Sequence, residues 1–315
     1  MERRKVICVV GPTACGKTTL GVLLAKKYGG EVVSADSMQI YRGMTIGTAA
    51  PTEAEMQGVP HHMIAVADPA EQWSAAEYVQ RATPVVDDIL ARGRLPVIVG
   101  GTGLWMDALL RGHGFAKGSA GGAVRRELET RFEQEGIEPL LAELRQVDPD
   151  SAVRLHPADT KRILRALEVY RETGQTITAH NAATQAMPDR YSAVKIGLRF
   201  ADREDMKVLI DRRVDKMAAE GLLTEVRALL DRGLPKNATA MQAIGYKEFL
   251  GVLDGTLTEP EALELVKLRS RQYAKRQLTW LRRDQDIHWI EWGKQRDFAR
   301  ALQISTEILA ASGLG

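Results

Sequence analysis

Cysteine is scarce in this sequence: the chain has only Cys8 and Cys15, and neither belongs to a C-x-x-C pair. This pattern excludes a disulfide framework and a zinc site of the usual spacing, and it fits a reducing compartment. No apolar run approaches the roughly 18 residues of a membrane-spanning helix. The charged start precedes only five apolar residues, too few for a signal peptide. We therefore expect a cytoplasmic protein without membrane association.

Net charge and length are similarly uninformative by themselves. The formal charge of +2 selects no class of partner, and a hydrophobic content of 44% is ordinary for a globular protein. At about 150 residues per domain, 315 residues allow one large domain or two smaller ones. The informative features are therefore local motifs.

The first strong motif is a glycine-rich segment between an apolar run and a helical pattern. Residues 6–10 are apolar, residues 19–28 are helical in pattern, and Gly11-Pro12-Thr13-Ala14-Cys15-Gly16-Lys17-Thr18 lies between them. This is the G-x-x-x-x-G-K-[ST] spacing in its strand–turn–helix context. Its backbone N–H groups and the helix N-terminus form an anion cradle, Lys17 adds a positive charge, and Thr18 offers a hydroxyl to magnesium. The motif predicts a bound polyphosphate or pyrophosphate and leaves the chemistry open.

Strand and helix patterns predict an α/β fold. Apolar strands at 6–10, 31–35 and 95–99 alternate with helices, and strands return at 193–200 and 287–291. Such alternation is typical of a parallel sheet with helices on both faces, here of the P-loop NTPase-like type. Between residues 114 and 189 only helical patterns occur, at 124–135, 139–147 and 160–173. We expect a catalytic core of residues 1–113 and 190–315, interrupted by an all-helical insertion domain of residues 114–189.

Polar residues follow the strands of this predicted core. Ligands of open α/β sheets bind beyond the carboxyl ends of the strands, so Asp36 and Thr102 should lie near the phosphate loop. Asp36 is a candidate general base or a carboxylate that reaches magnesium, and the alternative is a turn aspartate. The strand before Gly100 ends in glycines, whereas a nucleotide-hydrolysing protein should have a strand ending in Asp for magnesium. This weakens the kinase and ATPase interpretations.

One late helix is unusually basic. Thr258 and Glu261 form a capping box at its start, and residues 267–283 contain seven Lys or Arg and no Asp or Glu. Helical spacing predicts one basic and aromatic face, and a second set of residues that can pack on the core. The first set is Arg269, Tyr273, Arg276, Trp280 and Arg283, and the second is Leu268, Ala274, Leu278 and Leu281. The basic face suits phosphate contact and base stacking, and the alternative is a solvated helix whose Arg stems cover apolar surface.

Several segments taken together identify a family. They are the phosphate loop and residues 34–44, 46–49, 60–62, 100–104, 155–157, 162–168, 244–247 and 275–282. The combination resembles the tRNA dimethylallyltransferases, the bacterial-type tRNA isopentenyltransferases that modify the adenine just 3′ of the anticodon. The matches extend from residue 6 to 292, and their combination is specific although each glycine motif alone is not.

The resemblance implies a prenyl transfer. Dimethylallyl diphosphate would donate its dimethylallyl group to the exocyclic N6 of that adenine and release pyrophosphate, with Mg²⁺ as cofactor. The diphosphate would lie in the loop from Gly11 to Thr18, with Thr18 at the metal. In the family, the aspartate that matches Asp36 accepts the proton of the amine, and the threonine that matches Thr102 helps to orient the reacting groups. An arginine reaches the diphosphate, and Arg213 aligns better than Arg212.

The resemblance also implies the contacts to the partner, the tRNA anticodon stem-loop, whose target base is extruded into the site. We expect the chain to act as a monomer. The tRNA-contacting positions so implied are Asp36, Ser37, Met38 and Gln39; Lys161, Arg162, Ile163, Leu164 and Arg165; Gln242, Ala243, Ile244, Gly245, Tyr246 and Lys247; and Lys275, Arg276, Gln277, Leu278, Thr279, Trp280, Leu281 and Arg282.

Some alternatives stay open at this point. Cys15 stands where the family usually has Ser; it is either an inert replacement or, near Lys17 and a helix start, a thiol of lowered pKa that is sensitive to oxidants. Other functions are prenyl transfer to free adenine nucleotides, a small-molecule kinase and a non-catalytic RNA-binding protein. The insertion and the basic helix argue against the first of these, since a mononucleotide needs neither.

Overall fold

The computed structural model describes residues 4–112, 114–115 and 122–314. The chain divides into two compact units, one of Met1–Gly112 with Arg190–Gly315 and one of His113–Asp189. This division falls one residue before the boundary expected from the sequence, and residue 113 itself lies outside the described residues.

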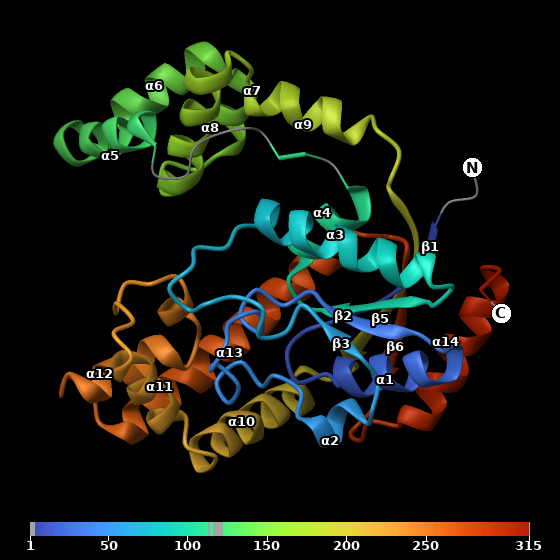
Figure 1. The fold of residues 1–315 in the computed structure, drawn as a ribbon. Coiled ribbons are helices and arrows are strands. Elements are labelled where there is room, and N and C mark those ends of the chain that lie inside the picture. The colour runs from blue at the N-terminus through green and yellow to red at the C-terminus, as the bar shows by residue number, and fades with distance from the viewer. Residues whose placement is uncertain (1–3, 113, 116–121, 315) are drawn as a thin grey trace. The chain divides into compact units, whose positions relative to one another are not determined.

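A parallel sheet in the order β3-β2-β4-β1-β5-β6 forms the centre of the first unit (Figure 1). Its strands are β1 (Arg4–Val10), β2 (Glu31–Ser34), β3 (His61–His62), β4 (Pro96–Gly100), β5 (Tyr191–Phe200) and β6 (Ile287–Trp292). The predicted α/β fold is thereby confirmed. Because β4 lies between β1 and β2, the segments that follow these three strands emerge side by side at one edge of the sheet.

Helices cover both faces of this sheet because alternate strand residues point to opposite sides. Val6, Cys8 and Val10 of β1 belong to an apolar core shared with α3 and α4, whereas Ile7 and Val9 belong to a second core shared with α1 and α14. Figure 1 shows α3 and α4 on one side of the sheet and α1 and α14 on the other. The helices of this unit are α1 (Lys17–Tyr28), α2 (Glu53–Met56), α3 (Ala75–Ala91), α4 (Gly103–Arg111), α10 (Arg203–Ala219), α11 (Leu222–Asp231), η1 (Ala240–Gln242), α12 (Tyr246–Leu253), α13 (Glu259–Leu281) and α14 (Phe298–Ala311).

Local chemistry sets several of these boundaries. Thr52 and Glu55 form a complete capping box at α2, and the same pair of residue types recurs at α13, where Thr258 and Glu261 cap each other. Gly29 caps the C-terminus of α1: its φ of 61° suits glycine, and its backbone N–H donates to the carbonyl of Ala25. In the described residues no helix is both long and apolar enough to cross a membrane.

The second unit is helical throughout its described part. It contains α5 (Ala123–Glu135), α6 (Glu138–Val147), α7 (Pro149–Arg154), α8 (Thr160–Thr173) and α9 (Ile177–Gln185). Its core is formed mainly by leucines of α5, α6 and α8. The sequence did not predict α7 and α9, because α7 is short and α9 has no fully buried residue. Asp148 links them, since its Oδ1 accepts hydrogen bonds from Ser151 N at 3.1 Å and from Thr178 Oγ1 at 2.6 Å.

Candidate active site

The phosphate loop connects β1 to α1 and is tied down by side chains from distant parts of the chain. Gln277 of α13 accepts a hydrogen bond from Thr13 N at 2.9 Å, and Trp292 Nε1 donates to the Cys15 carbonyl at 2.8 Å. Gly16 has a φ of 89°, and a Cβ there would lie 2.7 Å from the Phe298 ring. The loop is therefore held in shape by α13, β6 and α14, which the motif alone does not reveal.

Lys17 bends back over this loop. Its Nζ donates to the Pro12 carbonyl at 2.8 Å, and it lines a cavity of about 590 Å³. Burial lowers the pKa of Lys17, and the nearby charge of Asp36 acts in the opposite direction. The loop N–H groups, the start of α1 and Lys17 together make this end of the cavity electropositive, which suits an anion.

Asp36 and Thr102 follow the neighbouring strands β2 and β4. Asp36 Oδ1 accepts from Met38 N at 2.9 Å, so the residue does form the turn that the sequence left open as an alternative. Thr102 Oγ1 accepts from Ser37 N at 3.2 Å and thereby joins the two turns. Gln39 N also donates to Asp36 Oδ1, at 3.4 Å, and among the hydrogen bonds of the described residues none goes to Oδ2. A turn residue and a candidate base are thus the same side chain.

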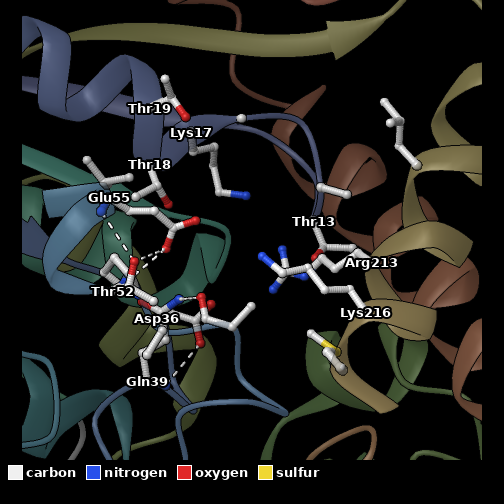
Figure 2. A pocket seen from close by; sticks show the side chains of 18 of the residues that line it. Thr13, Lys17, Thr18, Thr19, Asp36, Gln39, Thr52, Glu55, Arg213 and Lys216 are labelled. Carbon is white, nitrogen blue, oxygen red and sulfur yellow. Dashed lines mark hydrogen bonds between the residues drawn. The ribbon is translucent and has the colours of Figure 1, made fainter. Parts of the chain in front are cut away.

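Helix α10 contributes positive charge from the opposite side. Arg213 is half-buried, and its Nη2 donates to the Thr48 carbonyl at 3.3 Å, whereas Arg212 is exposed although it lines the same cavity. Burial lowers the pKa of Arg213, and Asp36 opposes this shift. In Figure 2, Lys17 and Arg213 point into one space that faces Asp36 and Glu55. Of the two arginines, Arg213 is therefore the better placed for a ligand at the phosphate loop.

Other residues of this cavity were missed from the sequence. Lys216 lies one helical turn beyond Arg212 and Arg213, a spacing that could have indicated it. Arg296 precedes α14 and donates to the Ala14 carbonyl at 3.3 Å. Glu55 lines the cavity as well. Neither Arg296 nor Glu55 has a sequence signal for this site, because each comes from a loop or short helix far from the motif.

A second, largely apolar cavity of about 180 Å³ adjoins the first. The two cavities share Thr13, Asp36, Arg213, Met217 and Tyr273. The apolar part is lined by Met38, Ile210, Val214, Met217, Ala243, Ile244 and Val266. Burial, followed by the charge of Asp36, raises the pKa of Tyr273 to about 12, so the phenol is neutral near pH 7. The site thus joins a cationic anion cradle to an apolar compartment, with Asp36 at the junction.

A family-wide sequence profile described as IPP transferase matches residues 39–284. The chain belongs to the IPP transferase family. It is 46% identical over 295 residues to the tRNA dimethylallyltransferase of Geobacillus thermodenitrificans, covering 94% of this chain and 93% of that protein. It is 48% identical to the enzyme of the same name from Symbiobacterium thermophilum, over 91% of this chain and 89% of the relative.

Solved structures of IPP transferases agree with this fold. The full-length tRNA isopentenylpyrophosphate transferase from Bacillus halodurans superposes with a TM-score of 0.73 at 41% identity, covering 98% of this chain and 96% of the other. A eukaryotic dimethylallyltransferase acting on tRNA gives a TM-score of 0.82 at 28% identity, over 98% of this chain and 80% of that one. The resemblance drawn from the sequence motifs is confirmed at the level of the family.

The basic helix α13 differs from its predicted arrangement. Tyr273 is not part of an exposed face, because its side chain lines both cavities. Leu268 was expected to pack on the core but is 44% exposed. Gln277 and Leu281, which were predicted to contact tRNA, are buried. The side chain of Gln277 forms hydrogen bonds with the phosphate loop and with the Gly101 carbonyl. The reason is that the loop and the cavities lie against this side of α13.

Other predicted tRNA contacts of α13 do lie on its surface. Lys275, Arg276, Thr279, Trp280 and Arg282 are exposed, and Leu278 is half-buried. Arg276 lies over the Tyr273 ring at 5.7 Å. By contrast, Lys267, Arg269 and Arg271 form ion pairs with Asp215, Glu248 and Asp211 at 2.8, 2.9 and 2.7 Å. The positive charge available to a nucleic acid is therefore concentrated in the second half of the helix.

Two further predicted tRNA segments are only partly accessible. In the second unit Lys161 and Arg162 are exposed and Arg165 is half-buried beside Glu168, but Ile163 and Leu164 belong to the leucine core, so their prediction as contacts is wrong. At the start of α12 and in the segment before it, Gln242 and Lys247 are exposed and Gly245 and Tyr246 are buried. Ala243 and Ile244 line the apolar cavity. The amphipathic period of α8 alone explains why neighbouring residues of that helix differ.

The structure decides between the two possibilities for Cys15. The side chain is fully buried, and burial raises its pKa, with the charge of Lys17 acting only as a weaker, opposing influence. The hypothesis of an activated thiol is therefore wrong. Cys15 is a small buried residue of the loop, and its Sγ packs against Gly11.

Proposed function

We propose that this chain transfers a dimethylallyl group from dimethylallyl diphosphate to N6 of the adenine 3′-adjacent to the anticodon in tRNA, and releases pyrophosphate. The observation that carries this proposal is that Asp36 lines both the cationic cavity and the apolar one. In an allylic diphosphate, the anionic diphosphate suits the cationic cavity and the prenyl group suits the apolar cavity. Relatives of similar length that are named tRNA dimethylallyltransferase support the same reaction.

The chemistry balances with the residues at hand. The N6 lone pair forms the new C–N bond while the allylic C–O bond breaks, and its electron pair leaves on pyrophosphate. Lys17, Arg213 and the loop N–H groups stabilise the charge that develops on the leaving group. Positive charge grows on N6 at the same time, so its proton becomes acidic enough for the Asp36 carboxylate to accept at Oδ2. Thr102 fixes the turn that carries Asp36.

The residues at this site suit Mg²⁺ as cofactor. Thr18, Asp36 and Glu55 line the cavity with hydroxyl and carboxylate oxygens, the ligand type that Mg²⁺ prefers. Within the described residues no cluster of three His, Cys, Asp or Glu side chains could hold a metal unaided. A diphosphate and water would therefore complete the coordination, as is common for this ion. Mg²⁺ bound there would neutralise charge on the diphosphate.

Binding of a tRNA loop is the part of the proposal that separates it from a nucleotide prenyltransferase. The exposed second half of α13, with Lys275, Arg276, Trp280 and Arg282, supplies positive charge and an aromatic ring. Such a surface suits phosphates and unstacked bases of single-stranded RNA.

We also propose that the enzyme acts as a monomer in the cytoplasm. Light scattering of the purified chain measures its oligomeric state.

One assay tests the proposal. The purified chain is incubated with tRNA, dimethylallyl diphosphate and MgCl₂. The tRNA is then digested to nucleosides, and their masses are measured by mass spectrometry. Prenylated adenosine is the expected product. Parallel reactions replace tRNA with AMP, or replace the prenyl donor with ATP. Efficient turnover of AMP would favour a nucleotide prenyltransferase, and release of ADP without the donor would favour a kinase.

A further inference from the structure

Glu225 of α11 accepts four hydrogen bonds from a loop of the active site and a fifth from Tyr246 of α12. Its Oε2 accepts from Thr45 N at 2.8 Å, Thr45 Oγ1 at 2.9 Å and Ile46 N at 2.9 Å. Its Oε1 accepts from Gly47 N at 3.0 Å and from the Tyr246 hydroxyl at 2.6 Å. A single carboxylate therefore satisfies the backbone N–H groups of three consecutive residues.

This arrangement is an anion-binding nest that is filled by a side chain of the same protein. Successive N–H groups that converge on one point favour negative charge there, and bonds to a carboxylate are stronger than bonds between neutral groups. Residues 45–50 form a compact turn, because Ala50 N donates to the Thr45 carbonyl at 3.0 Å and Ala49 N to the Ile46 carbonyl at 2.9 Å. The N–H groups of its first three residues donate to Glu225.

Packing fixes the same loop. A Cβ on Gly47 would lie 2.4 Å from the Tyr246 ring and 2.8 Å from Leu222, so only glycine allows the backbone to approach α11 and α12 this closely. The hydroxyl of Tyr246 reaches Glu225 from the other side. Hydrogen bonding and close contact thus define one position for the loop.

The loop in turn forms a wall of the site. Thr45, Ile46 and Ala49 line the cationic cavity, and Gly47 and Thr48 line the apolar one. The Thr48 carbonyl accepts the hydrogen bond from Arg213 Nη2, and the Ala49 carbonyl accepts from Gln39 Nε2 at 3.2 Å. Glu225 itself lines neither cavity, so its effect on a ligand has to pass through this loop.

We propose that Glu225 is a positioning residue for the donor diphosphate: by holding residues 45–47 it sets the wall of both cavities and the orientation of Arg213. The inference rests on the proposed function for the identity of the donor. The geometric part of the inference is independent of the proposed function, because pyrophosphate binding and hydrogen exchange of the loop amides can be measured without turnover. Glu225 touches no reacting group in this role.

The test uses Glu225→Gln, which keeps size but replaces one acceptor oxygen by an NH₂ group that faces N–H donors. Asp231→Asn, the same chemical change at the exposed end of α11, is the matched control. We expect binding of inorganic pyrophosphate with Mg²⁺, measured by titration calorimetry, to weaken roughly tenfold. The KM for dimethylallyl diphosphate should rise by a similar factor, while kcat and the affinity for tRNA change less than about threefold.

Hydrogen–deuterium exchange provides a readout that needs no substrate. The amides of Thr45, Ile46 and Gly47 should exchange faster in Glu225→Gln than in the wild type and in Asp231→Asn. Faster exchange with unchanged pyrophosphate binding would overturn the positioning role, and unchanged exchange would overturn the clamp itself. If Glu225→Gln does not fold, Glu225→Asp, which retains the charge on a shorter stem, carries the same comparison and the same criteria.

The two proposals fail in distinguishable ways. If the wild-type chain binds pyrophosphate but transfers no prenyl group to tRNA, the proposed function is contradicted. The role of Glu225 is then still tested by comparing pyrophosphate binding of the wild type and of Glu225→Gln. A wild-type chain that transfers the group, together with a Glu225→Gln variant of normal KM and normal pyrophosphate binding, contradicts the inference about Glu225 alone.

Discussion

Gln277 and Thr13 are 264 residues apart in the chain, yet the side chain of the first accepts a hydrogen bond from the backbone N–H of the second at 2.9 Å. The amide group of Gln277 also donates to the Gly101 carbonyl at 2.9 Å. One buried side chain of α13 therefore connects the phosphate loop after β1 with the turn after β4. The basic helix α13 is therefore part of the active site and also presents an exposed basic surface.

Replacing Gln277 should disturb the loop. In Gln277→Leu the shape is approximately kept, but Thr13 N and the Gly101 carbonyl lose their partners, and each unsatisfied buried group costs about 1–3 kcal/mol. We expect the free energy of unfolding to fall by about 2 kcal/mol or more and the KM for dimethylallyl diphosphate to rise. Chemical denaturation and initial rates measure the two effects. Gln272→Leu, on the exposed side of α13, should change neither, and equal behaviour of the two variants would contradict this link.

Asp36 can be tested without breaking its turn. Asp36→Asn keeps an oxygen for the bond from Met38 N but removes the proton acceptor. We expect turnover to fall by roughly 10²- to 10⁴-fold, the usual contribution of a general base, with tRNA affinity unchanged in a filter-binding assay. Near-normal single-turnover rates in this variant would exclude Asp36 as the base.

The two neighbouring arginines of α10 should differ. Arg213→Ala removes the half-buried cation that lies beside Asp36 and the Thr48 carbonyl, and we expect the KM for the donor to rise by roughly tenfold or more. Arg212→Ala removes an exposed charge, for which about threefold or less is expected, because solvent screens it. Steady-state kinetics of both variants at one ionic strength decides the order, and the opposite order would contradict the assignment of Arg213.

Cys15 should be unreactive in the folded protein. Burial raises the pKa of this thiol and also that of Cys8, to about 12 for Cys8, so the thiolate that reacts with alkylating reagents is rare at about pH 8. We expect neither thiol to react with iodoacetamide in the native state and both to react in guanidinium chloride, as measured by intact mass. Rapid modification of Cys15 in the native enzyme would contradict the buried position.

The salt dependence of tRNA binding should separate free from paired charges on α13. In Arg276→Ala we expect weaker binding and a plot of log affinity against log salt whose slope falls by about 0.7–1. In Arg271→Ala the slope should change less, because Asp211 already neutralises this guanidinium at 2.7 Å. Identical slopes for both variants would show that the second half of the helix is not the contact surface.

Much of this protein follows from its sequence because the signals are local. Short spacings, which the backbone converts directly into turns and periods, were enough for the phosphate loop, the strand at residues 31–35, the capping box at Thr258 and the helical insertion. The α/β pattern also predicted a parallel sheet, whereas the strand order that brings the ends of β1, β2 and β4 together is known only from the structure. The motifs also sufficed to identify the family.

Tertiary structure alone decided which side chains face the site. The 3.6-residue period of α13 was visible, but only packing against the phosphate loop determines that Tyr273 and Gln277 point inward and Leu268 outward. Arg296, Glu55 and Glu225 carry no sequence signal for the site, since each acts on residues far away in the chain. Burial likewise settled the state of Cys15, because desolvation outweighs the charge of Lys17. The sequence by itself determined the phosphate loop, because its spacing is local; the fold determined which distant side chains surround and shape it.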